Sequence, residues 1–361
     1  MDVGMTDNNY TIRDNADEYL SYFALREEPF APTSDPAWFH AAPHHIACLK
    51  RLWRCIDRRE GVAIALGDFG VGKSMLMRKI ASDLCAAPDQ YAVAVVGAPI
   101  GAWTSHELLE HIVRQFGLNP LDTSASGLCE AMNAHLLSNV ERNCVLLIDD
   151  AHHLGRRSHL ELLRILQTLE TPRHKLLSIL CFANTEWAQA LQAVPGFTQH
   201  ASDVVSIEPA RLDAVEQLIP WRIHHAAIPG NARQTPRFSA TALRAMHAYA
   251  AGNLRLVMNT CRNALFQAWR QQTRLIDHEI VLNTLESFLS MDDNSRARVA
   301  TVLLDAARHS LEVKRPPEET PVSAPTVPPL ETPAKQAPAY ASERDKKAAE
   351  LLLKNVPGHA P

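Results

Sequence analysis

A short apolar run followed at once by a glycine-rich loop constrains this chain more than any other feature. Residues 62–66 read Val-Ala-Ile-Ala-Leu, and residues 67–74 then carry the pattern Gly-x-x-x-x-Gly-Lys-Ser. The apolar run predicts a buried strand, and residues 73–84 predict the helix that leaves the loop. A strand, this loop and a helix in that order are the context of a phosphate-binding P-loop, also called a Walker A motif.

The residue types of the loop indicate what it binds. Its glycines let consecutive backbone N–H groups point at phosphate oxygens, and the helix N-terminus adds partial positive charge. Lys73 is expected to reach the β- and γ-phosphates of ATP, and the Ser74 hydroxyl is expected to ligate Mg²⁺. An ordinary glycine-rich turn with a surface lysine is the alternative, but it leaves the flanking strand and helix unexplained. The predicted nucleotide-binding residues are Gly67, Asp68, Phe69, Gly70, Val71, Gly72, Lys73, Ser74 and Met75.

Two carboxylates follow a second apolar run. Residues 144–148 read Cys-Val-Leu-Leu-Ile and lead into Asp149 and Asp150. In a P-loop protein, a carboxylate at the end of a buried strand holds the Mg²⁺ water shell, so Asp149 is the candidate Walker B residue. Asp150 is then the candidate general base for the attacking water. Alternatively, two aspartates at a strand end can simply cap the following turn. The P-loop upstream favours the metal-binding interpretation.

Two further polar residues are candidates for contact with the phosphates. Asn184 follows the apolar run at residues 176–182, and Arg255 opens the helix predicted over residues 254–269. A turn asparagine and a helix-surface arginine are the corresponding alternatives. The predicted catalytic residues are Lys73, Asp150, Asn184 and Arg255, and the predicted metal ligands are Ser74 and Asp149.

Strands alternate with helices through the first two thirds of the chain. The predicted strands are 62–66, 91–100, 144–148, 176–182 and 204–207, and amphipathic patterns separate them. Strands that alternate with helices predict a parallel sheet covered on both faces. The expected fold class is therefore α/β.

Composition sets the outer limits. A chain of 361 residues with 46% hydrophobic content is ordinary for a globular protein. The net charge of −4 gives no whole-protein attraction to nucleic acid, and we expect no basic DNA-binding stripe. The seven cysteines lack paired metal spacing and predict buried thiols. No signal peptide or membrane-spanning segment is visible, which predicts a cytoplasmic protein.

Composition also suggests domain boundaries. Residues 1–17 are polar and predicted to be disordered, and residues 18–209 form the predicted nucleotide-binding domain, whose N-terminal aromatic arm should pack on it. A helical lid is expected over 210–290, followed by a helical extension over 291–314. Residues 315–361 are rich in proline and predict an extended tail with a short helix, either a docking peptide or a frayed end.

Taken together, these motifs resemble the AAA+ ATPases of the general secretion pathway protein A (ExeA) type, over roughly residues 19–289. The resemblance implies an αβα P-loop NTPase fold with a C-terminal helical lid, in which Asn184 is the sensor 1 residue and Arg255 is the sensor 2 residue. It also implies assembly into a homo-oligomer with ATP. The matching pieces are Tyr22-Phe23, Pro29-Phe30, His45, the 67–74 loop, Asp149-Asp150-Ala151, Ala183-Asn184-Thr-Glu186 and Gly252-x-x-Arg255-x-x-x-Asn259.

The chain departs from that family at three places. Asp150 stands where the family usually has Glu, Asn184 where it has Gln, and Gln199-His200 where a Gln-Arg pair supplies a trans-acting arginine. Loss of an arginine finger can cost orders of magnitude in turnover, so slow hydrolysis is expected. Arg211 or Arg222 could substitute from a neighbouring subunit.

The resemblance implies ATP-driven assembly or regulation of a multiprotein machine. A bacterial secretion or pilus system is one setting, and a mobile element's transposition complex is another, because soluble TniB- and MuB-like ATPases share this core. A slow-turnover ATP switch is the third alternative. The expected partners are further copies of the chain and proteins of such a complex; nucleic acid is possible but unsupported by net charge.

Overall fold

The computed structural model describes residues 18–312, apart from 193–194, 200 and 288–291. Contacts within the chain divide it into two compact units, each considered by itself. We call residues 27–227 and 252–259 the sheet unit, and we call residues 1–26, 228–251 and 260 onward the helical unit.

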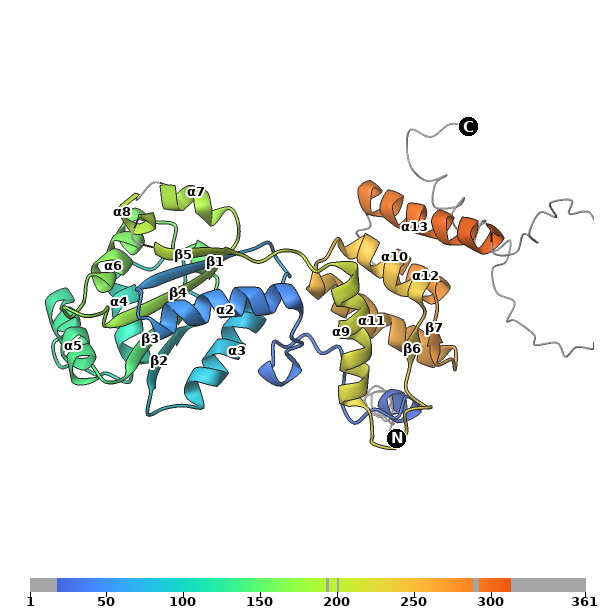
Figure 1. Cartoon of the computed structure of the whole chain (residues 1–361), viewed down its shortest axis with the longest axis horizontal. Helices are drawn as coiled ribbons and strands as arrows, with labels where there is room; N and C mark the ends of the chain where they lie inside the picture. The colour runs from blue at the N-terminus through green and yellow to red at the C-terminus, as the bar shows by residue number, and fades with distance from the viewer. Residues whose placement is uncertain (1–17, 193–194, 200, 288–291, 313–361) are drawn as a thin grey trace, which may run out of the picture. The chain divides into compact units, whose positions relative to one another are not determined.

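The sheet unit is built on a five-stranded parallel sheet with the strand order β2-β3-β4-β1-β5 (Figure 1). Its strands are β1 (Val62–Leu66), β2 (Tyr91–Val96), β3 (Asn143–Ile148), β4 (Leu177–Ala183) and β5 (Ala201–Ser206). Its helices are η1 (Pro36–Trp38), α2 (Pro43–Asp57), α3 (Lys73–Cys85), α4 (Ser105–Gln115), α5 (Ala125–Ser138), η2 (Ala151–His153), α6 (Arg157–Gln167), α7 (Trp187–Gln192), α8 (Pro195–Thr198) and α9 (Leu212–Ala226).

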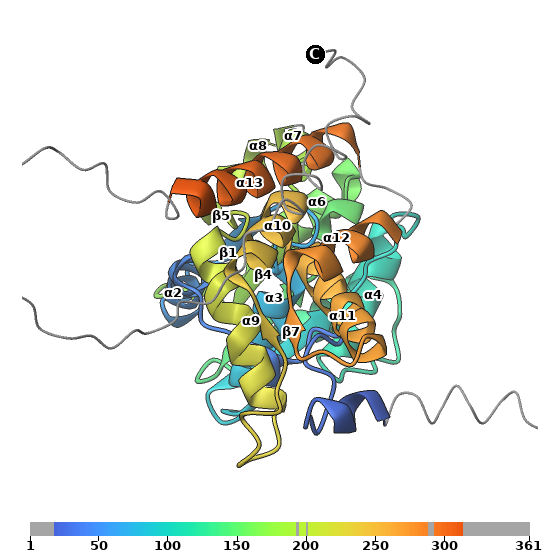
Figure 2. The same ribbon diagram turned by 90° about the vertical axis from the view of Figure 1, so that its right-hand side faces the viewer.

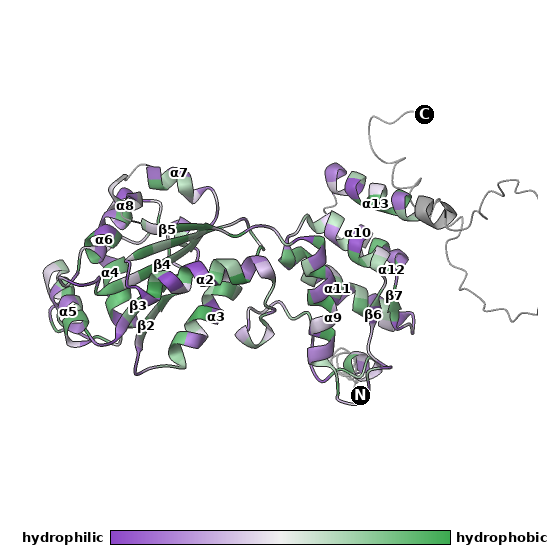
Figure 3. Ribbon diagram, viewed as in Figure 1, coloured by the Kyte–Doolittle hydropathy of each residue, from purple (hydrophilic) through white to green (hydrophobic). Residues whose placement is uncertain are grey.

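The sheet is covered by helices on both faces. Successive side chains of a strand point to opposite sides, so each strand contributes to two apolar clusters. In β1, Val62 and Ile64 pack with α4, α5 and α6, whereas Ala63 and Ala65 pack with α2 and α3. Figure 3 shows the central strands as predominantly apolar. This arrangement is an αβα sandwich and confirms the predicted α/β class.

The strand order decides which loops meet at the carboxyl edge of the sheet. β4 lies between β1 and β3. The Gly67 N–H donates to the Ala183 carbonyl across 3.1 Å, and Ile148 pairs with Cys181. The segments that follow β1, β4 and β3 are therefore neighbours, and these segments carry most of the predicted site residues.

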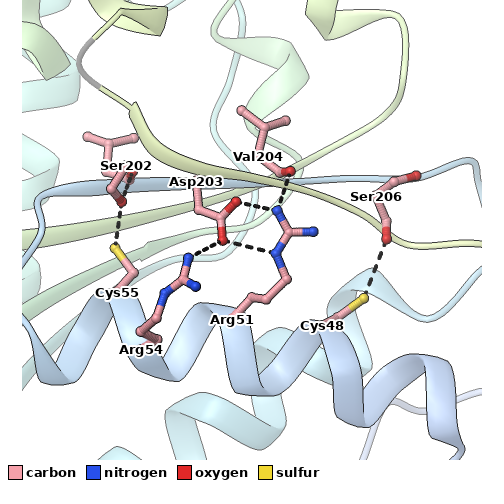
Figure 4. A network of polar contacts seen from close by, with 9 residues as sticks. Cys48, Arg51, Arg54, Cys55, Ser202, Asp203, Val204 and Ser206 are labelled. Atoms are coloured by element: carbon pink, nitrogen blue, oxygen red, sulfur yellow. Dashed lines mark hydrogen bonds and ion pairs between the residues drawn. The ribbon is translucent and has the colours of Figure 1, made fainter.

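Helix α2 is tied to the edge strand β5 by a network of polar contacts (Figure 4). The Asp203 carboxylate accepts from the Arg51 Nε at 3.0 Å and from Arg54 at 2.8 Å. Its hydrogen bonds with Arg51 lower the pKa of Asp203. The Cys55 thiol lies 3.1 Å from the Ser202 hydroxyl, which donates to the Val62 carbonyl. Through these contacts the polar side chains of α2 hold the edge strand β5 in place.

The described residues of the helical unit form a short N-terminal helix at residues 18–22, four longer helices and a small two-stranded sheet (Figure 2). The longer helices and the two strands are β6 (Arg237–Phe238), α10 (Ala240–Ala250), α11 (Leu254–Arg270), β7 (Leu275–Ile276), α12 (His278–Ser287) and α13 (Asp293–Glu312). Helix α10 packs against α12 and α13, and β6 pairs with β7 in parallel. The first turns of α11 group with the sheet unit, so this helix is shared between the units.

Several sequence-based boundaries shift in the structure. The strand expected over 91–100 ends at Val96, and the strand expected to begin at residue 204 begins at Ala201. The aromatic arm is divided: Phe30 is buried in the sheet unit, but Tyr19 and Phe23 belong to the helical unit. The Tyr19 ring lies 6.4 Å from Phe266, which explains why this part does not follow the prediction.

Other expectations lie outside the described residues or stay predictions. The polar N-terminus (1–17) and the proline-rich tail (315–361) lie outside the described residues. Helix α9, which was expected to open the lid, groups with the sheet unit in the division by contacts. The domain boundaries expected from the sequence remain a proposal. Within the described residues, no helix is both long and apolar enough to cross a bilayer.

Candidate functional site

The loop between β1 and α3 has the backbone that a phosphate cradle needs. Gly70 and Gly72 have φ values of +79° and +106°, a region that residues with a side chain rarely adopt. A Cβ at Gly67 would lie 2.9 Å from the Ile207 carbonyl oxygen, so this position has no room for a side chain. The loop therefore curls tightly and presents the N-terminus of α3 at the sheet edge.

Lys73 begins α3 and lies almost fully inside the loop. The residue is 6% exposed, and its ammonium donates to the carbonyls of Gly67 and Asp68, each at 2.9 Å. Burial lowers the pKa of Lys73, while the carboxylates of Asp150 and Asp149 oppose that shift. The cation is thus held at the mouth of the loop and faces the two carboxylates that follow β3.

Asp149 and Asp150 occupy different surroundings although they are adjacent. Asp149 is 6% exposed, and it accepts hydrogen bonds from the Ser74 hydroxyl and, at 3.0 Å, from the Asp150 N–H. Burial raises the pKa of Asp149, and the bond from Ser74 opposes this. Asp150 is more exposed and has a left-handed backbone with a φ of +47°, which Asp tolerates better than most residues. The structure therefore joins both predicted metal ligands and leaves Asp150 accessible.

Asn184 lies beside the loop, at the end of β4. It is 7% exposed, and its side-chain oxygen accepts from the Trp187 N–H at 3.2 Å, which caps α7. Its neighbour Thr185 donates to the Asp68 carboxylate at 2.7 Å. The sequence singled out Asn184 and missed Thr185, whose hydroxyl links β4 directly to the loop.

The start of α11 is fastened to the same loop. The Arg255 N–H donates to the Gly70 carbonyl at 3.3 Å. The Asn253 side chain donates to the Phe69 carbonyl at 2.9 Å, and its oxygen accepts from the Leu256 N–H at 3.1 Å. Asn253 thus caps α11 and holds the loop with one amide group. The sequence pattern marked Arg255 but gave no signal for Asn253.

These elements surround a cavity of about 330 Å³, all of whose lining residues belong to the sheet unit. A volume of this size fits the usual range for small-molecule sites. The lining includes the loop, Asp150 and Arg255. It also includes apolar and ring-bearing side chains from the N-terminal arm, α2 and α9, among them Trp38, His40, His44, Ala214 and Leu218. Asp149 and Asn184 are not among the lining residues.

His45 forms a hydrogen bond with the backbone of the loop. Its Nε2 lies 3.1 Å from the Val71 carbonyl, and because a carbonyl only accepts, the neutral imidazole carries its hydrogen at Nε2. Burial, together with the neighbouring His44, lowers the pKa of His45 to about 4. A Cβ at Gly72 would lie 3.1 Å from the same nitrogen. His45 is therefore a neutral support for the backbone that the loop must adopt.

The candidates for a trans-acting arginine differ sharply. Arg222 is 6% exposed and donates to the carbonyls of Pro29 at 3.1 Å and Trp38 at 3.4 Å. Its guanidinium is committed to its own subunit, so the expectation that Arg222 could act on a neighbour is wrong. Arg211 is exposed and pairs loosely with Asp213 at 3.8 Å. His200 lies outside the described residues.

The residues present suit a nucleoside triphosphate with a divalent cation. The curled backbone and Lys73 suit phosphates, while the Ser74 hydroxyl and the Asp149 carboxylate supply oxygen ligands of the kind that Mg²⁺ prefers. The apolar and ring-bearing side chains of the lining suit a nucleobase.

Comparison with known proteins agrees with this geometry. Residues 56–191 match the family model of the AAA domain. General secretion pathway protein A of Aeromonas hydrophila is 28% identical over 267 residues, which cover 72% of this chain and 46% of that protein. The chain thus spans about half the length of that relative.

Two solved structures share the fold. The ORC2 protein of Aeropyrum pernix, in ADPNP-ADP complexes, has a TM-score of 0.53 and 14% identity, covering 75% of this chain and 74% of that one. Cdc6p of Pyrobaculum aerophilum has a TM-score of 0.54 and 16% identity, covering 77% and 79%. At such identities the likeness concerns the fold alone. Residues 56–191 thus match an AAA domain, and the chain is similar to general secretion pathway protein A.

Proposed function

We propose that this chain binds ATP with Mg²⁺ in the cavity of the sheet unit and hydrolyses it slowly. The observation that carries this proposal is that Lys73, Ser74 and Asp150 all line one cavity of about 330 Å³, while Asp149 is hydrogen-bonded to Ser74. The two carboxylates oppose the effect of burial on Lys73, and a lysine so placed can pair with the phosphates. Mg²⁺, when bound, would neutralise charge that develops on the phosphates.

Each residue has a distinct part in the proposed reaction. Ser74 and Asp149 would hold the cation, and Asp150 would take the proton of the attacking water. Asn184 would orient that water, and Arg255 would contact the phosphates from the start of α11. Because Asp150 is one methylene shorter than Glu, its carboxylate stands farther from the water, which would keep turnover low.

We further propose that ATP drives assembly or regulation of a multiprotein machine through self-association of the chain. The similarity to general secretion pathway protein A supports a bacterial secretion or pilus system. A transposition complex and a slow-turnover switch are the alternatives, and cytoplasmic location remains a prediction. Adjacent secretin or pilus genes would support the first setting, whereas an adjacent transposase gene would contradict it.

The nucleotide assignment is tested by equilibrium binding of a fluorescent ATP analogue with Mg²⁺. Lys73→Ala should weaken triphosphate binding by about 100-fold or more, because it removes a buried charged contact. Lys79→Ala is the matched control, since Lys79 lies on the same helix but pairs with Asp83 at 2.6 Å. Equal affinities for the wild type and Lys73→Ala would refute the assignment.

Self-association is tested by sedimentation at micromolar concentration. With a slowly hydrolysed ATP analogue, the chain should sediment as a larger species than without nucleotide. A monomer under both conditions would argue against assembly while leaving ATP binding untouched.

A further inference from the structure

The charge of this chain is distributed very unevenly. Residues 217–276 contain eight arginines and no lysine, aspartate or glutamate, although the whole chain has a net charge of −4. Two of these arginines, Arg222 and Arg255, belong to the sheet unit. The other six belong to the helical unit: Arg233, Arg237, Arg244, Arg262, Arg270 and Arg274.

The fold brings several of these arginines together at the small β6–β7 sheet. The Arg237 N–H donates to the Arg274 carbonyl at 2.8 Å, which places two arginines on neighbouring strands. The Arg274 side chain in turn donates to the Gln234 carbonyl at 3.0 Å, next to Arg233 in the chain. Two segments that are distant in the chain therefore bring Arg237 and Arg274 together at one short ladder, with Arg233 close to them in the chain.

Aromatic side chains connect this cluster to α11. The Arg274 guanidinium lies 4.5 Å from the centre of the Tyr22 ring. From Tyr22, ring contacts run through Phe23 and Tyr19 to Phe266, at centroid distances of 4.9, 5.7 and 6.4 Å. Figure 2 shows the short N-terminal helix beside β7 and the end of α11.

Helix α11, which these ring contacts connect to the cluster, carries two further arginines on one stripe. Arg262, Phe266 and Arg270 are spaced four residues apart and so lie along one stripe of the helix. Phe266 is 42% exposed, so part of its ring is open to solvent between the two arginines. We call Arg233, Arg237, Arg262, Arg270 and Arg274, with Tyr22 and Phe266, the arginine surface.

The charges of this surface are not neutralised nearby. Within residues 18–312 and their described contacts, no ion pair joins Arg233, Arg237, Arg262 or Arg270 to a carboxylate. In the sheet unit, by contrast, exposed arginines such as Arg58, Arg114 and Arg157 each lie beside a glutamate. An unneutralised group of cations creates a local positive potential, whatever the net charge of the chain.

We propose that the arginine surface binds the phosphate backbone of a nucleic acid. Arginine pairs with phosphate through two parallel N–H groups, so a set made only of arginine suits a regular row of phosphates better than a diffuse negative surface does. The exposed Phe266 ring offers a base or sugar a stacking face, as aromatic residues do among basic ones in nucleic-acid sites. The contacts involve the backbone, so binding is independent of base sequence.

The test measures fluorescence anisotropy of labelled 30-base-pair duplex DNA, single-stranded DNA and RNA with the full-length chain between 50 and 200 mM salt. The variant Arg233→Gln/Arg237→Gln/Arg270→Gln should bind at least about tenfold more weakly at low salt than the wild type does. Its plot of log affinity against log salt should flatten by about one for each phosphate that the variant no longer binds. Arg274 is left unchanged because its side chain holds Tyr22 and Gln234.

Two controls separate charge at this surface from charge elsewhere. Arg58→Gln/Arg114→Gln/Arg157→Gln removes the same net charge from the sheet unit and should keep wild-type affinity. Replacing Arg233, Arg237 and Arg270 with lysine should preserve the salt dependence, because the charges remain.

Three outcomes would overturn the proposal. They are equal loss of binding in both glutamine triples, absence of binding to all three nucleic acids at 50 mM salt, and binding only to vesicles that contain anionic lipid. None of these outcomes depends on ATP binding, so the proposed ATPase function stands or falls separately.

Discussion

The sheet unit and the helical unit place their charged side chains in opposite ways. In the sheet unit, Lys73 and Asp149 are each 6% exposed and have hydrogen-bond partners fixed by the surrounding backbone. In the helical unit, Arg233, Arg237 and Arg270 are exposed and lie on a surface with no described ion pair. The buried charges of the sheet unit therefore act through fixed positions of individual side chains. The exposed arginines of the helical unit act through their summed charge.

This difference determines how each unit should respond to change. A buried charge that loses its partner is costly, so single substitutions in the sheet unit should have large effects. Exposed charges act together and are screened by salt, so single substitutions in the helical unit should have small effects. Substitutions test this contrast, from the largest expected effect to the smallest.

The largest effect is expected at Asp150. Asp150→Asn should lower steady-state phosphate release by about 10²- to 10⁴-fold, the usual contribution of a positioned general base. Asn is the suitable replacement because it tolerates the left-handed backbone at this residue (φ +47°) and removes only the charge. A variant that releases phosphate as fast as the wild type would show that Asp150 is not the base.

Asp150→Glu provides the opposite test at the same position. It should raise turnover, because the carboxylate would move forward by one methylene, about 1.5 Å. The left-handed backbone should make this variant somewhat less stable, since Glu lacks the short side chain that favours this conformation. Faster phosphate release with a lower melting temperature is the expected combination, and unchanged turnover would count against slow hydrolysis being due to the shorter side chain.

The next effect is the dependence of stability on pH at His45. Its pKa of about 4 in the folded chain lies below the usual histidine value of 6.5. Between these two values the unfolded chain binds the proton more tightly, so stability is lost as the pH falls from 6.5 towards 4. Replacement by Gln keeps a donor for the Val71 carbonyl but cannot titrate in this range.

The loss between pH 7 and pH 5 should therefore be smaller in His45→Gln than in the wild type by about 2 kcal/mol. Urea unfolding at the two pH values measures this difference. Partial burial also lowers the pKa values of His40 and His44, and these residues contribute the same trend to both proteins. His106→Gln, at an exposed position, should behave as the wild type does. A parallel loss in wild type and His45→Gln would mean that His45 is not buried in neutral form.

The fold and the centre of the site were accessible to sequence analysis because their signals are local. The apolar run of β1, the loop at 67–74 and the start of α3 are contiguous, and each pattern follows directly from strand burial or from phosphate geometry. Asp149 could be placed at the sheet edge because the carboxyl ends of parallel strands share that edge.

The features that sequence analysis missed have one of two causes. Some depend on contacts between residues far apart in the chain, and one was hidden because the net charge is summed over the whole chain. Arg222 looks like a surface arginine in the sequence, but its partners Pro29 and Trp38 lie more than 180 residues away. Thr185 and Asp68 are 117 residues apart. The arginine-rich segment was overlooked because the net charge of −4 sums acidic and basic regions that the fold keeps apart. Local periodicity carries no information about any of these.

The smallest expected effect compares two helix caps, one in each unit. Asn253 caps α11 through the Leu256 N–H, and Asp277 caps α12 through the Ile280 N–H at 3.0 Å. Replacing either residue with Ala should lower the free energy of unfolding by about 1 kcal/mol, the usual value of an N-cap. Only Asn253 also donates to the Phe69 carbonyl, so only Asn253→Ala should weaken ATP binding, by roughly three- to tenfold.

Asn253→Ser separates the two roles, because serine still caps a helix but is too short to reach Phe69. It should keep most of the stability and share the loss of affinity, as measured by thermal unfolding and by binding of the ATP analogue. Wild-type affinity in Asn253→Ser would mean that the hydrogen bond to the loop does not shape the nucleotide site, and that the sheet unit tolerates small changes as well as the helical unit does.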